Sequence, residues 1–153
     1  IRRADRGDPW SNHIALPGGH VDAADANAQE AAYRETAEEV GIAAEAVTHL
    51  GDLGIFPTQL PELWVRVFVG QWRGDQPPQA EPSEVAAVFE VPLSGLLRHH
   101  QAQGFDARTT AELGARLTYP VSQGTIWGVT ARIIHRLLEL IAIPSHGLWV
   151  ASP

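Results

Sequence analysis

The chain has 153 residues and a mass of 16.6 kDa, enough for one domain with a sizeable hydrophobic core. Its formal charge of −7 argues against a general nucleic-acid-binding protein, because such proteins usually carry a basic face. The sequence has no cysteine, which excludes disulfides and thiolate zinc sites, and no apolar run long enough to span a membrane. With no signal peptide visible, these features favour a cytoplasmic protein.

The first quarter of the chain predicts a strand, a glycine turn and a helix. Residues 1–3 are expected to end a strand, and residues 4–11 to form a loop. A short apolar run then enters the turn Pro17-Gly18-Gly19, where glycine lets the backbone approach a ligand. Asp25 or Asn27 is expected to cap a helix that runs to about Val40, and Gly41 to end it.

The rest of the chain alternates between expected strands and helices. Strands are predicted at residues 47–53, 63–72 and within 84–91, a short helix at 94–100, and an amphipathic helix at 125–143. Residues 101–117 are expected to be a loop with one weak strand. This order of elements predicts an α/β sandwich with a mixed β-sheet. Trp64, Trp72 and Trp127 are expected to pack in the core or on the sheet, and His99-His100 to form an exposed helix end.

Three glutamates carry the clearest chemical signal in the sequence. Glu35, Glu38 and Glu39 stand at i, i+3 and i+4, so a helix places them on one face as neighbours. Carboxylates that close repel one another, and a hard divalent cation with oxygen ligands would relieve the repulsion. The alternative is a solvated helix surface on which Arg34 pairs with Glu30 or Glu38.

The segment from Leu16 to Ile42 resembles the Nudix box, whose usual form is G-x5-E-x7-R-E-U-x-E-E-x-G-U, with U a bulky aliphatic residue. The positions that match are Gly19, Arg34, Glu35, Glu38, Glu39, Gly41 and Ile42. The resemblance implies an α/β/α Nudix fold over residues 1–153 as one domain, whose N-terminal strands are expected to be trimmed. It also implies hydrolysis of a nucleoside diphosphate linked to another moiety.

The box departs from the usual form in a way that indicates a subgroup. Asp25 replaces the early glutamate, the gap from it to Arg34 is one residue longer, and Thr36 replaces an aliphatic residue. The stretch Gly18-Gly19-x-x-Asp22-x-x-Asp25 is similar to the variant in coenzyme A pyrophosphohydrolases of the Nudix superfamily. Later segments resemble the same branch, including Trp127-Gly128-Val129-Thr130.

The region upstream of the box departs from that branch. Its relatives carry an arginine followed by x3-G-x3-F-P-G-G, and here Asp8, Asn12 and Leu16 stand in place of the arginine, glycine and phenylalanine. An acid in place of a base removes a phosphate contact unless Arg6 replaces it.

The resemblance implies a role for each candidate residue. Mg²⁺ or Mn²⁺ is the expected cofactor, with Glu35, Glu38 and Glu39 as ligands and Glu35 as the preferred base. Arg34 is expected to orient a glutamate. Asp22 and Asp25 could extend the metal site, but turn and cap roles are the preferred interpretation. The candidate substrate-binding residues are Gly18, Gly19, Arg2, Arg3, Arg6 and Glu84. Glu84 is equally well interpreted as a solvated loop residue.

The preferred hypothesis is therefore a hydrolase that cleaves coenzyme A or acyl-coenzyme A to 3′,5′-ADP and a phosphopantetheine. One alternative is the same chemistry on ADP-ribose or another nucleoside diphosphate sugar, a dinucleotide or a nucleoside triphosphate. Another is a non-catalytic nucleotide-binding domain, against which the intact glutamates argue. The expected partner is a small nucleotide or coenzyme A-like molecule, with neither nucleic acid nor membrane, and the sequence does not determine the oligomeric state.

Overall fold

The computed structural model describes residues 1–104 and 117–142. The elements in this part of the chain are, in order, β1 (Arg2–Arg3), α1 (Ala28–Val40), η1 (Ala44–Ala46), β2 (Val47–Pro57), β3 (Trp64–Trp72), β4 (Val85–Ala87), α2 (Leu93–Ala102), β5 (Tyr119–Val121), β6 (Gly124–Ile126) and α4 (Gly128–Ala142). None of the described helices combines the length and the apolar character that a membrane crossing requires.

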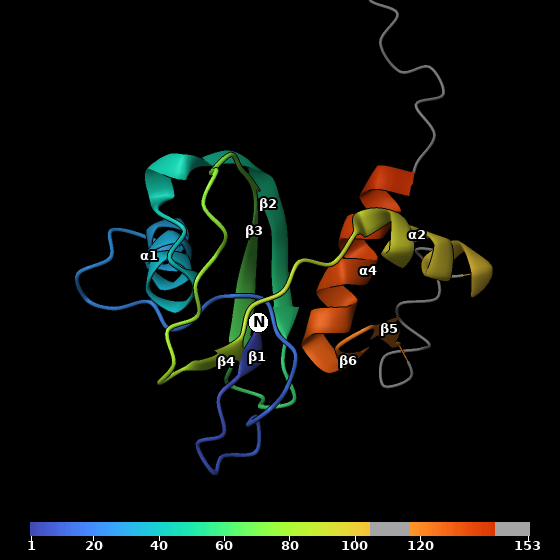
Figure 1. Cartoon of the computed structure of the whole chain (residues 1–153), viewed down its shortest axis with the longest axis horizontal. Helices are drawn as coiled ribbons and strands as arrows, with labels where there is room; N and C mark the ends of the chain where they lie inside the picture. The colour runs from blue at the N-terminus through green and yellow to red at the C-terminus, as the bar shows by residue number, and fades with distance from the viewer. Residues whose placement is uncertain (105–116, 143–153) are drawn as a thin grey trace, which may run out of the picture.

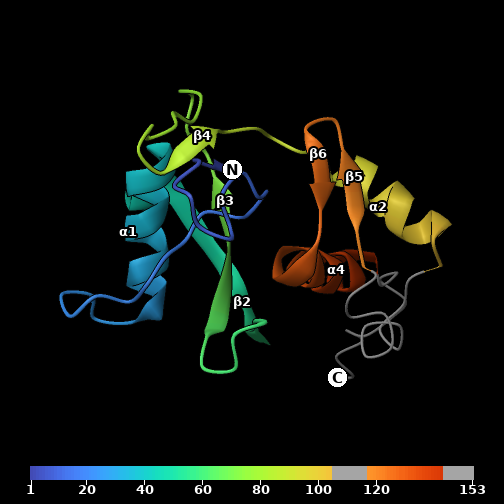
Figure 2. The same ribbon diagram turned by 90° about the horizontal axis from the view of Figure 1, so that it is seen from below.

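The long hairpin of β2 and β3 separates two helical layers. Helix α1 lies on one side of the hairpin, whereas α4 lies on the other side with α2 next to it (Figures 1 and 2). The two strands pair antiparallel from Val47 opposite Trp72 to Pro57 opposite Trp64, with two register shifts along β2. The α/β class is therefore confirmed, with helices on both faces of the central hairpin.

Strand pairing differs in detail from the single mixed sheet that we expected. The described strands form three two-stranded antiparallel pairs, β1 with β4, β2 with β3, and β5 with β6. β1 has two residues and β4 has three, so each offers few backbone groups for a ladder with the central hairpin. The chain after β1 turns back on itself, because Ile14 makes an antiparallel bridge to Arg2.

Two hydrophobic clusters stabilise the layers. The larger one joins α2, β5, β6 and α4, and its buried members are Leu96, Leu117, Tyr119, Ile126, Ala131, Ile134 and Leu138. The smaller one is made by Ile1, Val40 and Val85, and so it ties the end of α1 to the β1–β4 pair. Burial of these side chains is the main favourable contribution to packing. The second cluster also fixes where the last turn of α1 lies.

The last helix starts later than its apolar stripe predicts. Thr125 belongs to β6, which pairs with β5 across a tight turn in which Gly124 has φ of +141°. Gly128, with φ of +65°, then begins α4. The turn and the glycine break the helical periodicity, so the expectation of a helix from residue 125 was wrong by three residues. The weak strand expected within residues 101–117 falls largely outside the described residues.

Several side chains are not where their residue types predicted. Trp64 and Trp127 are 59% and 45% exposed, so neither packs in the core, although Trp64 stands in strand β3, the sheet position that was the other expectation. Trp127 instead meets the His13 ring edge-on, with 4.7 Å between ring centroids. His100 is buried, not exposed at a helix end, because the end of α2 packs against α4 and β5. The exposure of each of these side chains depends on whether another layer of the fold packs over it, which the local sequence does not reveal.

Candidate active site

Helix α1 presents the three glutamates of the box. Its first turn is capped by Asn27, whose Oδ1 accepts hydrogen bonds from the backbone N–H groups of Gln29 (2.9 Å) and Glu30 (3.0 Å). Its last turn ends at Gly41, which has φ of +70° and donates its N–H to the Ala37 carbonyl. The cap is Asn27 and not Asp25, which leaves the Asp25 side chain available for another contact.

Arg34 connects the loop before α1 to the glutamates on the helix. Its Nε and Nη2 atoms donate to the two carboxylate oxygens of Asp25, at 2.9 and 3.0 Å. Its Nη1 donates to Glu35 at 3.1 Å and to Glu38 at 2.9 Å, and its Nη2 also donates to the His20 carbonyl at 3.0 Å. A planar guanidinium with fixed donor directions suits such a junction. Arg34 therefore holds two of the three glutamates and the extended loop together.

The contact of Asp25 with Arg34 was not predicted from the sequence. Only 3% of the Asp25 side chain is exposed, and the hydrogen bonds from Arg34 lower the pKa of its carboxyl group. It also accepts the backbone N–H of Asp22, which is the expected turn role. One signal in the sequence could have indicated this contact: the usual box has an acidic residue, a glutamate, near the position of Asp25.

Glu39 occupies a different environment from the other two glutamates. It is 3% exposed and accepts the backbone N–H of Gly18 at 2.9 Å. Burial raises its pKa most, the Gly18 hydrogen bond opposes this, and the charges of Glu35 and Glu84 raise it further. The influence of Glu84 shows that this residue brings its negative charge close to the box. Arg34 offsets the charges of Glu35 and Glu38, and the charge of Arg3 lowers the pKa of Glu39, so the neighbouring arginines relieve part of the repulsion between these carboxylates.

The glycine turn lies directly against the glutamates. A side chain at Gly19 would meet the carboxylate of Glu35 and displace it, so glycine here leaves that carboxylate in its place beside the turn. Gly18 has φ of +151°, a conformation that residues with a side chain rarely adopt. The turn thus passes close enough to Glu35 and Glu39 for its backbone to share a ligand with them.

The three candidate arginines do not all face the glutamates. The charge of Arg3 lowers the pKa of Glu39, and the Nη1 atom of Arg6 lies 3.6 Å from an oxygen of Glu84, where both side chains are about half exposed. Arg2 instead donates to the Gln123 carbonyl at 2.5 Å, in the turn between β5 and β6. Side chains of neighbouring residues in a strand point to opposite faces, which explains why the side chains of Arg2 and Arg3 point away from each other. The structure therefore brings Arg3, Arg6 and Glu84 to the site and leaves Arg2 outside it.

Comparison with known proteins agrees with this geometry. The model of the NUDIX domain family matches residues 1–113. Proteins described as uncharacterized Nudix hydrolase NudL are similar to the chain: 33% identical over 133 residues in Photorhabdus laumondii subsp. laumondii, covering 87% of this chain and 71% of the relative. The relative from Yersinia enterocolitica is 35% identical over 143 residues, covering 93% of this chain and 72% of the relative. The relative from Escherichia coli K12 is 35% identical over 133 residues, covering 87% of this chain and 69% of the relative.

A Nudix domain generally uses a divalent metal ion such as Mg²⁺ and acts on small nucleotide substrates. The family model covers more than half of this chain, and the relatives exceed 30% identity over most of it. The chain therefore belongs to the Nudix hydrolases, which cleave phosphoric anhydride bonds.

Proposed function

We propose that this chain hydrolyses the pyrophosphate of coenzyme A or acyl-coenzyme A and releases 3′,5′-ADP and the corresponding phosphopantetheine. The observation that carries the proposal is the extended box, whose extra residue resembles the coenzyme A branch. The extension is integrated into the site, because its Asp25 binds Arg34 through both carboxylate oxygens. The loop that contains the extra residue is therefore fixed to the glutamate helix through Arg34.

Glu35, Glu38 and Glu39 are the proposed ligands of Mg²⁺ or Mn²⁺. The donor set fits such an ion because carboxylate oxygens are its preferred ligands, and because burial, and after it the charges of Glu35 and Glu84, raise the pKa of Glu39. The bound ion would offset phosphate charge and lower the pKa of a bound water. Arg34 pairs with Glu35 and Glu38, whereas Glu39 accepts the N–H of Gly18, so a cation would neutralise the charge that remains.

The protein groups have distinct proposed roles in the reaction. A water oxygen forms a bond to one phosphorus, the bridging P–O bond of the anhydride breaks, and a carboxylate takes the proton of the water. Glu35 is our choice of base, since Arg34 holds its carboxylate at 3.1 Å beside the glycine turn. Backbone groups of Gly18 and Gly19 would contact metal or phosphate, and Arg34 would position Glu35 and Glu38 without touching the substrate.

The upstream arginines support a phosphate-binding role despite the acid at position 8. The carboxylate of Asp8 accepts the N–H of Trp10 at 2.8 Å and the hydroxyl of Ser11 at 3.2 Å, so it organises its own loop. Arg3 and Arg6 lie on the side of the glutamates and are the proposed phosphate contacts. Arg2 is no longer proposed as a contact, because its guanidinium binds the Gln123 carbonyl.

A substrate panel tests the proposal. The protein is incubated with Mg²⁺ or Mn²⁺ and coenzyme A, an acyl-coenzyme A, ADP-ribose, NADH, a diadenosine polyphosphate or a nucleoside triphosphate, and the products are separated by chromatography. The expected result is 3′,5′-ADP at the highest kcat/KM. Faster turnover of ADP-ribose, a dinucleotide or a triphosphate would overturn the coenzyme A assignment and keep the hydrolase. The Glu38→Gln variant, run in parallel, identifies any turnover by a contaminant.

A further inference from the structure

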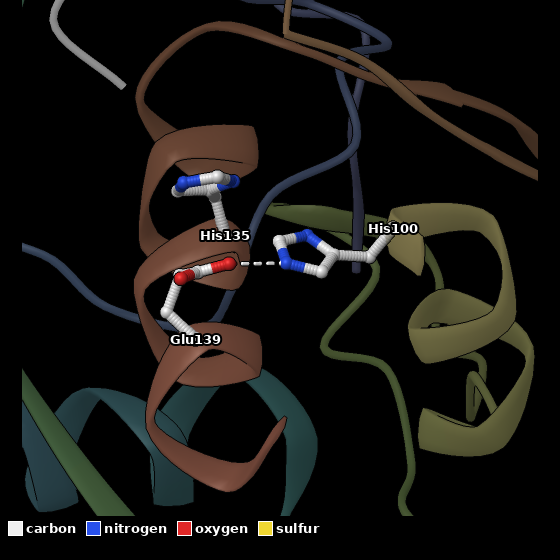
Figure 3. Close-up of side chains that lie close together, drawn as sticks. All are labelled: His100, His135 and Glu139. Carbon is white, nitrogen blue, oxygen red and sulfur yellow. Dashed lines mark hydrogen bonds and ion pairs between the residues drawn. The ribbon is translucent and has the colours of Figure 1, made fainter. Parts of the chain in front are cut away.

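A second cluster of metal-binding residue types lies on the other side of the central hairpin. His100 from α2 meets His135 and Glu139 from α4, and one ligand atom from each of the three lies within 4.8 Å of the others (Figure 3). We call His100, His135 and Glu139 the histidine cluster. Both histidines are nearly completely buried, and the Glu139 side chain is 17% exposed. The cluster is separated from the box by β2 and β3 (Figure 1).

The fold positions each member of the histidine cluster. His135 and Glu139 stand at i and i+4 on α4, so both side chains project from the same face of the helix toward α2 (Figure 3). His100 comes from the last turn of α2, where its Nε2 contacts Glu139 Oε1. Packing of α2 on α4 around Leu96 and Leu138 therefore creates the convergence.

The surrounding contacts resemble the support that metal-ligating histidines receive. The hydroxyl of Tyr119 lies 3.0 Å from His100 Nδ1 and 3.4 Å from His135 Nδ1. With Nδ1 of His100 held by Tyr119, the ring directs Nε2 toward the carboxylate of Glu139. Histidine ligands usually have their second nitrogen fixed by a polar partner in this manner, which sets the ring orientation.

The donor set favours a transition metal over Mg²⁺. Two imidazoles and one carboxylate are the ligands of many zinc sites that leave a fourth position open, and of non-haem iron sites. Ligand atoms at about 2.0–2.1 Å from a tetrahedral ion lie roughly 3.4 Å apart, so ligand atoms as far apart as 4.8 Å must approach by up to about 1.4 Å. His100 Nε2 and Glu139 Oε1 are already in hydrogen-bond contact, so this pair must separate to admit the ion. The all-carboxylate box, by contrast, has the chemistry of a hard-cation site.

We propose that His100, His135 and Glu139 bind a transition metal ion of the Zn²⁺ class, which links α2 to α4. This site is additional to the box and does not depend on the substrate assigned above. Neutral imidazoles and one carboxylate leave a divalent ion with a net charge of +1, so burial costs less than for the bare ion. The ion holds together helices whose sequence positions are far apart, since His100 and Glu139 are separated by 39 residues.

Cobalt binding to the whole chain tests this site. The protein is made with Glu38→Gln to weaken the box, and Co²⁺ is titrated while visible absorption is recorded. Nitrogen-containing sites of four or five ligands give intense bands, whereas six oxygen ligands give weak ones. We expect intense bands that saturate at one equivalent, and metal analysis after dialysis against Zn²⁺ should give the same stoichiometry.

Matched variants identify the ligands. Glu139→Gln and His135→Gln should each weaken binding by more than the roughly 10–100-fold that loss of an outer partner causes, and Tyr119→Phe should fall within that range. His99→Gln is the control, because His99 is next to the cluster and its Nε2 contacts the Thr118 carbonyl. Circular dichroism checks that each variant is folded. Absence of the intense bands in the parent, or equal bands in the parent and both ligand variants, would overturn the proposal.

Discussion

Two polar clusters lie on opposite sides of the β2–β3 hairpin (Figure 1), and they differ in the number of carboxylates that they bring together. On α1, Glu35, Glu38 and Glu39 crowd together, and burial and like charges raise the pKa of Glu39. Beside α4, one carboxylate, Glu139, contacts His100, and Tyr119 contacts both His100 and His135. The first cluster thus gathers several like charges, whereas the second has a single carboxylate paired with an imidazole.

This difference in charge indicates whether each cluster contributes mainly to catalysis or to folding stability. A functional site that needs a ligand commonly costs the protein stability when the ligand is absent. Exposure does not follow this division, because Glu38 is 58% exposed but Glu39 and His100 are both buried. We therefore expect changes on α1 to act mainly on catalysis, and their effects on folding to be small or favourable.

The largest expected effect is that of Glu38→Gln on catalysis. Loss of this proposed ligand should lower kcat/KM by roughly two orders of magnitude or more. Because Glu38 is exposed and its ion pair with Arg34 lies at the surface, the free energy of unfolding should change by less than about 1 kcal/mol. Steady-state kinetics and thermal denaturation measure the two quantities. Glu45→Gln makes the same charge change outside the box and should leave both unchanged; parental activity in Glu38→Gln would refute the ligand assignment.

A smaller effect is expected for Asp25→Asn. The amide keeps the shape of the side chain but loses the charge that holds Arg34, so Glu35 and Glu38 lose their fixed orientation. We expect kcat to fall by about 10–100-fold, as for other groups that orient metal ligands. Asp22→Asn is the matched control, because Asp22 lies 3.7 Å from Arg34 and is 67% exposed. If both variants lose the same activity, the contact of Arg34 with Asp25 has no special importance.

The smallest effect, and the sharpest test of the comparison, is a gain in stability from Glu39→Gln without metal. The folded state raises the pKa of Glu39, so it favours the protonated group and the parent loses stability as pH rises above the ordinary glutamate range. The uncharged amide removes this loss and still accepts the Gly18 N–H through its oxygen. The melting temperature in a chelator should rise by a few degrees, since 1 kcal/mol corresponds to about 2–4 °C at this size.

The pH dependence of this gain separates charge relief from altered packing. It should be largest at neutral pH and disappear in acid, where Glu39 of the parent is already protonated. The same variant should lose activity with Mg²⁺, so that stability and function move in opposite directions. A gain that is equal at both pH values, or a lower melting temperature at neutral pH, would contradict the assignment of strain to Glu39.

Much of helix α1 could be predicted from local sequence. The spacing of Glu35, Glu38 and Glu39, the cap at Asn27 and the stop at Gly41 all depend on residues within a few positions of one another. Such neighbours meet in any helix, whatever the helix packs against. The start of α4 was predicted less well, because residues 125 and 126, which were expected to belong to the helix, instead pair with β5 as part of β6.

The sequence by itself determined the family motif, the helix that carries it and the α/β class, since each follows from short-range spacing and periodicity. Only the tertiary structure decided that Asp25 binds Arg34, that Gly18 binds Glu39, and that Arg2 turns away from the glutamates. It alone also brought His100 to Glu139. These contacts join separate segments, and their geometry depends on how whole layers pack, which no local pattern encodes.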